Sequence, residues 1–341
     1  MTLRDYLDLV RAPAVLSVVG DTLAGASAAG RLGRPRRAAG PAAGADVRPW
    51  RLALLPLSSA CLYAGGMALN DYADRELDAV ERPERPLPSG RVSPTQALGV
   101  ASGLTVAGLA LAGVGGGRRS FALAVPLAAS VWTYDLVAKN HASGPVVMAA
   151  CRGLDVLMGA GLGRVRAALP AAAALTVHTA GVTVLSRGEV HGTTQPVAAA
   201  VAAGTVSVAG AVAVGALRSL RRRPTAALTS ASSAGTSTAG TVTTGRATTV
   251  VPALASLVSA GVYVASCLPH QAAAVGSPDA RNAFAATKAG IRSMVPLQAA
   301  LAARGGSLGS VAVLAGVELA GRALRARGRR RVSPNPGLSE S

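Results

Sequence analysis

The segment Asn70–Asp78 carries three aspartates at a spacing that suits a metal ion. It reads Asn-Asp-Tyr-Ala-Asp-Arg-Glu-Leu-Asp and directly follows an apolar run. In a continuous helix Asp71, Asp74 and Asp78 stand at i, i+3 and i+7, so they share one face. Clustered carboxylates suit Mg²⁺, which prefers hard oxygen ligands and usually binds through a few carboxylates and substrate phosphates. Asn70 adds an amide that can bind the metal or orient an aspartate, so the segment predicts a Mg²⁺ site for a phosphorylated substrate.

Surface ion pairs are the alternative explanation of these charges. Arg75 lies four residues from Asp71, and Arg82 lies four residues from Asp78, which is the spacing of helical ion pairs. Ionisable residues at the end of a membrane span are costly, however, and by default they mark a functional site. Their position therefore favours the metal site.

The next stretch, Glu81–Gly90, is rich in arginine and proline. Pro83 disfavours a helical conformation at the residue before it, so the chain must leave the helix there. Arg82 and Arg85 can then fold back as donors to a diphosphate, a group that arginine binds well. A basic membrane loop stiffened by proline is the alternative.

The composition indicates that membrane helices position these residues. Half of the 341 residues are hydrophobic and only 15% are charged, whereas about a quarter of the residues in a soluble domain are charged. The formal charge is +18, but the basic residues lie in short clusters between apolar runs, as they do beside anionic headgroups. This arrangement argues against nucleic acid as a partner. The three cysteines all lie in apolar runs without metal-ligand spacing and are expected to be free thiols.

About nine apolar stretches are candidate transmembrane helices, and a tenth is possible by length. They are Pro13–Ala29, Leu52–Leu69, Ala97–Val114, Phe121–Val137, Pro145–Gly161, Ala167–Leu185, Pro196–Leu217 and Val250–Leu268, with Ala283–Ala302 and Leu308–Leu324 as the weaker ones. The first is interpreted as a retained span, because no small-residue cleavage site follows it. We expect one all-α transmembrane domain over residues 1–325, with a basic loop at 31–51, a low-complexity loop at 224–249 and a polar tail at 326–341.

The motif resembles the first signature of the UbiA superfamily of intramembrane prenyltransferases. The resemblance is carried by Asn-Asp-x-x-Asp-x-x-x-Asp followed by Arg-Pro-x-Arg-Pro-Leu-Pro-Ser-Gly, placed after the second span. It implies a polytopic membrane helix bundle around a central chamber that opens to the lipid. It also implies Mg²⁺-dependent transfer of an isoprenyl group from a prenyl diphosphate to a lipophilic acceptor, with the Asp-rich loops on the cytoplasmic side of a bacterial-type plasma membrane. The arginine clusters at 31–51 and 218–223 would then face outside, so the charge count alone does not settle the orientation.

Further diphosphate ligands are implied by the resemblance. Arg11 matches the basic residue at the start of the first span. Tyr134-Asp135-x-x-x-Lys139 resembles the segment after span four in which the lysine neutralises the diphosphate, and an Asp135–Lys139 pair at a helix end is the alternative. Arg152-Gly-Leu-Asp resembles the Arg-x-x-Asn segment of span five, with Asp155 in place of asparagine. Two charges inside an apolar span are expected to pair, so a structural ion pair is the alternative to a substrate role.

The second Asp-rich motif of the family is degenerate in this chain. Its place reads Ser186-Arg187-Gly-Glu-Val-His191-Gly, and only Glu189 keeps a carboxylate as a metal ligand. Either one metal suffices, or Arg187 and His191 supply positive charge directly, or the site no longer ionises a prenyl diphosphate. This form resembles the EboC-like branch, found in gene clusters for a secondary metabolite.

Aromatic rings can stabilise an allylic cation through their faces. The chain has two Trp, five Tyr and two Phe, and the candidates near the predicted site are Tyr63, Tyr72, Trp132 and Tyr134. His178 and His270, each alone in or beside an apolar span, are interpreted as packing residues.

Two rivals to the enzyme remain at this point. A binding or transport protein for an isoprenoid or related metabolite on the same fold is supported by the degenerate second motif. A soluble terpene cyclase or chain-elongating synthase also uses Asp-rich Mg²⁺ sites, but the apolar spans argue against it.

Overall fold

The computed structural model describes residues 2–11, 15, 17–32, 49–221 and 240–332, and these form helices and no strands. Most of the predicted basic loop, most of the low-complexity loop and the last nine residues therefore lie outside the described residues, as does Pro13 of the first predicted span. The helices in chain order are α1 (Leu3–Leu9), α3 (Val19–Ala28), α4 (Pro49–Leu52), α5 (Leu54–Ala73), α6 (Arg75–Glu81), α7 (Pro94–Thr133), α8 (Gly144–Ala160), α9 (Val165–Ser186), α10 (Gln195–Arg221), α11 (Gly240–Gly276), α12 (Ala280–Arg304) and α13 (Leu308–Val332).

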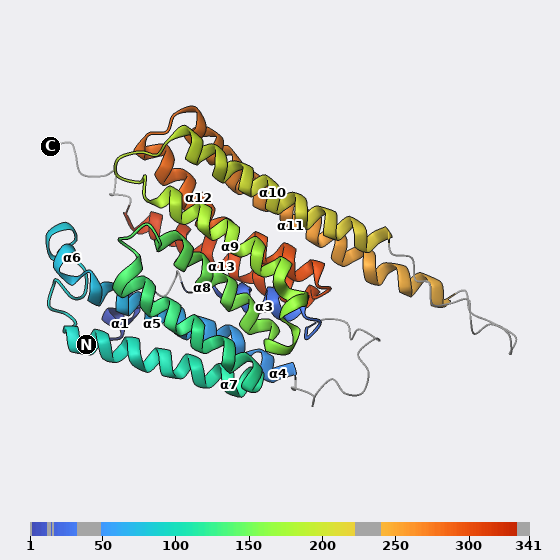
Figure 1. The fold of residues 1–341 in the computed structure, drawn as a ribbon, viewed down its shortest axis with the longest axis horizontal. Coiled ribbons are helices and arrows are strands. Elements are labelled where there is room, and N and C mark those ends of the chain that lie inside the picture. Colours follow the sequence, from blue (N-terminus) through green and yellow to red (C-terminus); the bar gives the residue numbers. More distant parts are fainter. Residues whose placement is uncertain (1, 12–14, 16, 33–48, 222–239, 333–341) are drawn as a thin grey trace, which may run out of the picture.

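Five helical stretches in the described residues are long and apolar enough to cross a membrane. They are Trp50–Ala73, Pro94–Ala138, Leu162–Ser186, Gln195–Arg221 and Thr249–Gly276. Apart from the first, each predicted span coincides with a helix or with half of one, and the described chain is a membrane helix bundle, as expected (Figure 1). Of the first predicted span, Pro13–Ala29, the helix α3 covers only Val19–Ala28. Two further boundaries differ from the prediction, because α11 already begins at Gly240 and α13 continues to Val332.

Helix α7 is two antiparallel halves rather than one rod. Gly117 lies between them with φ 69° and ψ −168°, a conformation that other residues rarely adopt. Trp132 in the second half donates a hydrogen bond from Nε1 to Oγ1 of Thr105 in the first, at 3.1 Å. A straight helix would separate these residues by about 40 Å, so the chain reverses at Gly117, and the predicted spans Ala97–Val114 and Phe121–Val137 are separate passes.

The short helix α3 is the centre of the bundle. It contacts α5, α8, α9, α12 and α13, and residues 20–27 are all buried. A Cβ at Gly25 would lie 1.8 Å from the carbonyl oxygen of Val156, and a Cβ at Gly159 would lie 2.1 Å from that of Thr22. Glycine at these crossings lets α3 and α8 approach closely, which is how helices pack in lipid.

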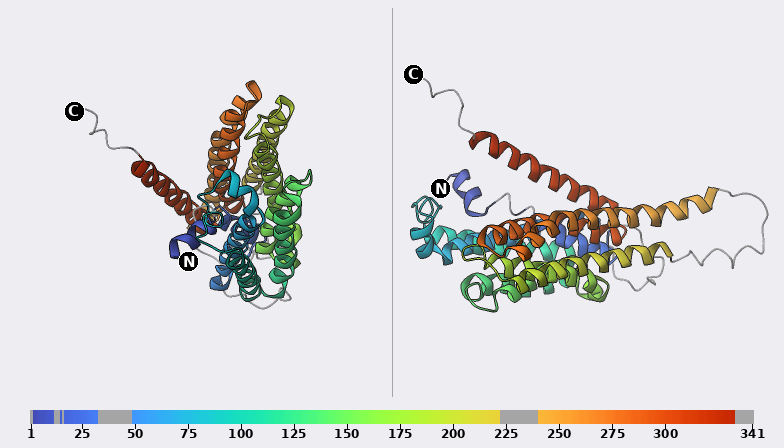
Figure 2. Two further views of the ribbon diagram at one scale, coloured as in Figure 1. Left: turned by 90° about the vertical axis from the view of Figure 1, so that its left-hand side faces the viewer. Right: turned by 90° about the horizontal axis from the view of Figure 1, so that it is seen from above.

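The long helices α10 and α11 run side by side along one edge, and α11 also packs on α12 (Figure 1). Both views in Figure 2 show the C-terminal part of α13 diverging from the other helices. Helices α1 and α6 lie at one end of the bundle, and α4 and the turn of α7 lie toward the other. The predicted site is at the α6 end.

Candidate active site

The Asp-rich segment is bent at Asp74. Helix α5 ends at Ala73 and α6 begins at Arg75, with Asp74 at φ −93° and ψ 6° between them. The expected continuous helix through Asp78 is therefore wrong at this residue. The bend keeps the hydrogen bond from the Asp74 amide to the Asn70 carbonyl at 2.9 Å but redirects the following turn. Asp71 and Asp78 remain only 3% and 2% exposed.

Arginines from two other segments neutralise the buried carboxylates. Arg11 Nη2 lies 2.7 Å from Asp71 Oδ1, and Arg85 Nη1 lies 2.5 Å from Asp78 Oδ2 and 3.6 Å from Asp71 Oδ1. Arg82 is farther away, at 3.7 Å from Asp78. Arg75 pairs with Glu76 at 3.3 Å and has no ion pair with Asp71 among the described residues. Of the two surface ion pairs that were the alternative explanation, only the long Arg82–Asp78 contact is therefore present. The loop does fold Arg85 back onto the aspartates, as predicted.

The N-terminal helix α1 is fastened over this loop. Arg91 donates from Nη1 to Asp5 Oδ1 at 3.0 Å and to Asp8 Oδ2 at 3.2 Å. Hydrogen bonds from Thr2, with a contribution from Arg91, hold the pKa of Asp5 below its usual value. The bonds of Arg91 to Asp5 and Asp8 hold the chain in place just before Arg11. The φ angle of Arg11 is 48°, which is unusual for a residue with a Cβ. Such backbone strain recurs at functional sites.

Lys139 forms an ion pair with the Asp-rich segment rather than with Asp135, its neighbour four residues earlier. Its Nζ lies 2.6 Å from Asp74 Oδ1. Asp135, the partner in the alternative interpretation, instead accepts a hydrogen bond from Asn70 Nδ2 at 3.3 Å. The intervening Tyr134–Ala138 is a π-helical turn, which changes the register at which Lys139 leaves the helix.

A cavity of about 70 Å³ lies beside this cluster, between α5, the end of α7 and α8. Tyr63, Tyr134 and Asp135 line it, so two of the four predicted aromatic residues face it. Tyr72 does not line it, because its ring lies 4.8 Å from the Arg75 guanidinium. Trp132 is held in the seam of α7 by its bond to Thr105.

The deep wall of the cavity is polar, and its pairing corrects an expectation. Arg152 does not pair with Asp155. Its Nη1 lies 2.6 Å from Oδ2 of the fully buried Asp21, whose Oδ1 accepts from Gln298 at 2.6 Å. Asp155 accepts from Ser59 Oγ through one oxygen, and its other oxygen has no partner among the described residues. Neither Asp21 nor Gln298 was among the predicted site residues. Asp21 could have been found, because a charged residue inside an apolar span by default marks a functional site. An amide such as Gln298 does not stand out in the sequence in this way.

The degenerate second motif lies at the same end of the bundle. Arg187 donates to the carbonyl of His141, in the loop that follows Lys139. Ser186 Oγ donates to the Thr183 carbonyl at 2.9 Å. Burial raises the pKa of Glu189, and a hydrogen bond with Thr287 and the charge of Arg82 only partly oppose this.

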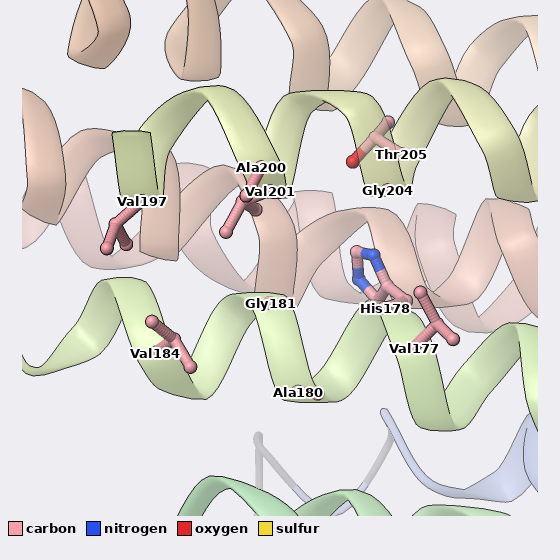
Figure 3. Close-up of a pocket in the computed structure, with 10 residues that line it drawn as sticks. All are labelled: Val177, His178, Ala180, Gly181, Val184, Val197, Ala200, Val201, Gly204 and Thr205. Atoms are coloured by element: carbon pink, nitrogen blue, oxygen red, sulfur yellow. The ribbon is translucent and has the colours of Figure 1, made fainter. Parts of the chain in front are cut away.

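A second cavity of about 260 Å³ lies between α9 and α10 (Figure 3). His178 lies at its edge, where its Nδ1 is 2.9 Å from the Tyr263 hydroxyl and its Nε2 is 3.0 Å from the Gly290 carbonyl. Both ring nitrogens are therefore satisfied, which confirms His178 as a packing residue. The remaining lining is aliphatic apart from Thr205, and the cavity carries no reactive group.

The donor set at the Asp-rich end fits Mg²⁺. No three His, Cys, Asp or Glu side chains within the described ranges are grouped closely enough to hold a metal, and Asp71, Asp78 and Asp74 are each paired with a cation instead. Arg11, Arg85 and Lys139 are long side chains that occupy the positions of positive charge beside Asp71, Asp74 and Asp78. Hard carboxylate oxygens, buried and dependent on positive charge, are what Mg²⁺ requires.

Comparisons with known proteins show the family and the fold of the chain. The UbiA prenyltransferase family model matches residues 38–265, about two thirds of the chain. A digeranylgeranylglyceryl phosphate synthase of Methanopyrus kandleri is 52% identical over 61 residues, which are 18% of this chain and 22% of that protein. A synthase of the same name from Ignicoccus hospitalis is 42% identical over 106 residues, 31% of this chain and 30% of that protein. The chain thus spans less than a third of the length of either relative.

A solved structure described as a digeranylgeranylglyceryl phosphate synthase in membranes has a similar fold. Its TM-score is 0.52 at 16% identity, over 91% of this chain and 98% of that chain. At this identity the likeness shows the fold alone.

Proposed function

The chain belongs to the UbiA prenyltransferase family, and on that premise we propose that it transfers an isoprenyl group from a prenyl diphosphate to a lipophilic acceptor in the membrane, with Mg²⁺ as cofactor. One observation carries the proposal. Buried carboxylates from the Asp-rich segment and cations from three other segments converge beside a cavity in the bundle.

A metal–diphosphate site needs carboxylates for the metal and cations for the diphosphate, and in this structure these two sets of side chains form ion pairs with each other. Asp71, Asp74 and Asp78, with the Asn70 amide, are the residues that would hold Mg²⁺. When bound, Mg²⁺ supplies positive charge that stabilises the leaving diphosphate. Arg11, Arg85 and Lys139 are released from the aspartates to bind the diphosphate oxygens, so every charge in the site keeps a partner.

The remaining predicted ligands contribute less directly. Arg82, half exposed on the loop, extends the cationic rim, and Arg187 is placed to support the loop after Lys139. Glu189 is a candidate for a second metal only if it gives up its hydrogen bond with Thr287. Arg152 is engaged by Asp21, so we assign it to the wall of the cavity rather than to the diphosphate.

The reacting carbon lies in the cavity. The bond between C1 of the prenyl group and the diphosphate oxygen breaks, and the electron pair leaves with the diphosphate. Tyr63 and Tyr134 face the allylic cation, and the apolar part of the lining, which includes Leu62, Leu127 and Val131, keeps water from trapping it. A nucleophilic atom of the acceptor forms the new bond at C1, and its proton passes to Asp135, a carboxylate of the cavity lining that accepts a hydrogen bond from Asn70.

The protein is an integral membrane protein by its family and its apolar helices. We place it in a bacterial-type plasma membrane with the Asp-rich end on the cytoplasmic side. The lipophilic acceptor reaches the cavity from the membrane lipid.

A specific observation favours a second function. The second motif offers one carboxylate, and Glu189 and Ser186 are each already hydrogen-bonded within the fold. A site with few metal ligands can bind a prenyl diphosphate without ionising it. The second candidate is therefore an isoprenoid-binding or transport protein on the same fold.

A direct assay separates the two functions. Detergent-solubilised protein is incubated with radiolabelled geranyl, farnesyl or geranylgeranyl diphosphate, Mg²⁺ and a lipid extract, with and without EDTA. The enzyme releases diphosphate only with Mg²⁺ and moves the label to a lipid-soluble product that names the acceptor. Saturable binding without release would instead support the binding protein.

A further inference from the structure

Three arginines meet at the end of the bundle opposite the Asp-rich site. Each follows a glycine at positive φ that ends a helix, and the three pairs are Gly30 and Arg31, Gly117 and Arg119, and Gly161 and Arg164. These glycines have φ angles of 68°, 69° and 75°, so all three turns use the left-handed region that glycine tolerates. The three turns lie close together, because the charges of Arg119 and Arg164 act on Arg31 and a Cβ at Gly161 would lie 3.2 Å from Arg31 Nη1 and 3.6 Å from Arg119 Cβ.

Helix capping explains part of this arrangement. Arg31 Nη1 donates to the Gly159 carbonyl at 2.8 Å, and Arg164 Nη1 donates to the Ala29 carbonyl at 3.0 Å. Both carbonyls lie at helix C-termini, where basic side chains are stabilising. Each guanidinium has five N–H donors, so most donors of these two residues are unused. Arg119 makes no side-chain hydrogen bond in the described part of the chain, and capping does not account for it.

The cluster also has positive charge without a counterion among the residues that the structure describes. None of the three arginines forms an ion pair with a described carboxylate. Burial, together with repulsion from Arg164 and Arg119, lowers the pKa of Arg31 to about 10. Arg119 is exposed and Arg164 is half-exposed, so an anion can reach the group from outside.

The position of the cluster suits a phosphate at the membrane surface. The 20 residues of α5 separate the two ends of the bundle by about 30 Å, the thickness of the hydrocarbon core. Since the Asp-rich site lies at one membrane face, the cluster lies at headgroup depth on the other. Guanidinium groups bind phosphate oxygens through paired hydrogen bonds.

We propose that Arg31, Arg119 and Arg164 form a phosphate-binding site on the face opposite the Asp-rich end. Its ligand is a phosphate group, carried by a phospholipid headgroup or present as free phosphate. The site is separate from the proposed active site and does not depend on the proposed activity. It gives a role to arginines that otherwise oppose the positive-inside tendency.

The test compares Arg119→Gln with Arg118→Gln, its neighbour in the same turn. The two variants lose the same charge, but Arg118 is not among the charges that act on Arg31. Full-length protein in detergent is titrated with phosphatidylglycerol, followed by native mass spectrometry, and with inorganic phosphate, followed by thermal unfolding. Both titrations are repeated with Arg31→Gln as a second variant.

We expect Arg119→Gln to weaken phosphatidylglycerol binding about tenfold, the loss expected for one charge-assisted contact. Arg118→Gln should bind as the wild type does. An Arg119-dependent effect with the lipid alone identifies a headgroup site, and an effect with inorganic phosphate as well identifies a site for the free ion. Equal binding by the wild type, Arg119→Gln and Arg31→Gln, for both ligands, would overturn the proposal. Prenyl diphosphate binding at the other end should be unchanged in all variants, which separates this result from a failure of the proposed function.

Discussion

Arg85 contacts Asp78 and Asp71 at 2.5 and 3.6 Å, so replacing it by glutamine should change metal and diphosphate binding in opposite directions. In the proposed mechanism Arg85 holds the aspartates until Mg²⁺ arrives and then binds the diphosphate. Without it, the carboxylates lose a competing cation, and the diphosphate loses a ligand. A residue that serves only the fold would not show opposite effects.

The sizes of both effects follow from the geometry. The Arg85 side chain is 20% exposed and Asp78 is 3% exposed, so the ion pair is neither a surface pair nor fully buried. Its net contribution is about 1–2 kcal/mol, and its loss should tighten Mg²⁺ binding without diphosphate about 5–30-fold. A lost charge-assisted hydrogen bond of about 1.5–3 kcal/mol should weaken diphosphate binding at least tenfold.

Isothermal titration calorimetry in detergent measures both affinities. Mg²⁺ is titrated first into the free protein, and a non-hydrolysable prenyl diphosphate analogue is titrated next at saturating Mg²⁺. Arg75→Gln is the matched control, because Arg75 bonds Glu76 and the Tyr72 carbonyl and leaves the aspartates untouched. Mg²⁺ binding that is unchanged or weaker in Arg85→Gln would refute the exchange of partners.

Three further predictions concern stability, each measured by unfolding in detergent with tryptophan fluorescence. Asp21→Ala should cost about 3–5 kcal/mol because it leaves the Arg152 charge buried and unpaired, and a smaller loss in Asp21→Ala with Arg152→Met is the accompanying check. Gly117→Ala should cost about 1–3 kcal/mol through backbone strain at φ 69°, and an unchanged stability would show that the turn of α7 relaxes. Because burial raises the pKa of Glu189 above its usual 4.5, the wild type should lose stability as pH rises through that pKa. Glu189→Gln should remove this loss, so an identical pH profile in the variant would contradict the assignment.

The spans were predictable because apolar length is a local property. The long helices of the bundle appear in the sequence as apolar runs, and even the turn at Gly117 lies between two of the predicted spans. The short helices α1 and α4 were not predicted. Arg85 was also predictable, since Pro83 ends the helix and the loop then returns the arginine to the aspartates.

Pairings across the bundle were not predictable in the same way. Lys139 could pair with Asp135 by spacing, but a π-helical turn and the approach of α5 give it Asp74 instead. Arg152 likewise takes Asp21 from α3 rather than Asp155 from its own helix. Sequence distance also could not show that Trp132 bonds Thr105 instead of lining the cavity, because the face on which an aromatic ring lies depends on the packing of α7.

Magnesium-dependent diphosphate release by a variant pair tests the central claim most directly. Asp74→Asn removes a carboxylate that Lys139 contacts at 2.6 Å, whereas Glu76→Gln changes an exposed carboxylate two residues away. Release of labelled diphosphate from a prenyl substrate is followed with Mg²⁺ and with EDTA. We expect the wild type and Glu76→Gln to release diphosphate only with Mg²⁺, and Asp74→Asn, still folded in detergent, to lose at least about a hundredfold in rate. Release by Asp74→Asn at the wild-type rate would contradict the assignment of the Asp-rich segment as the catalytic site.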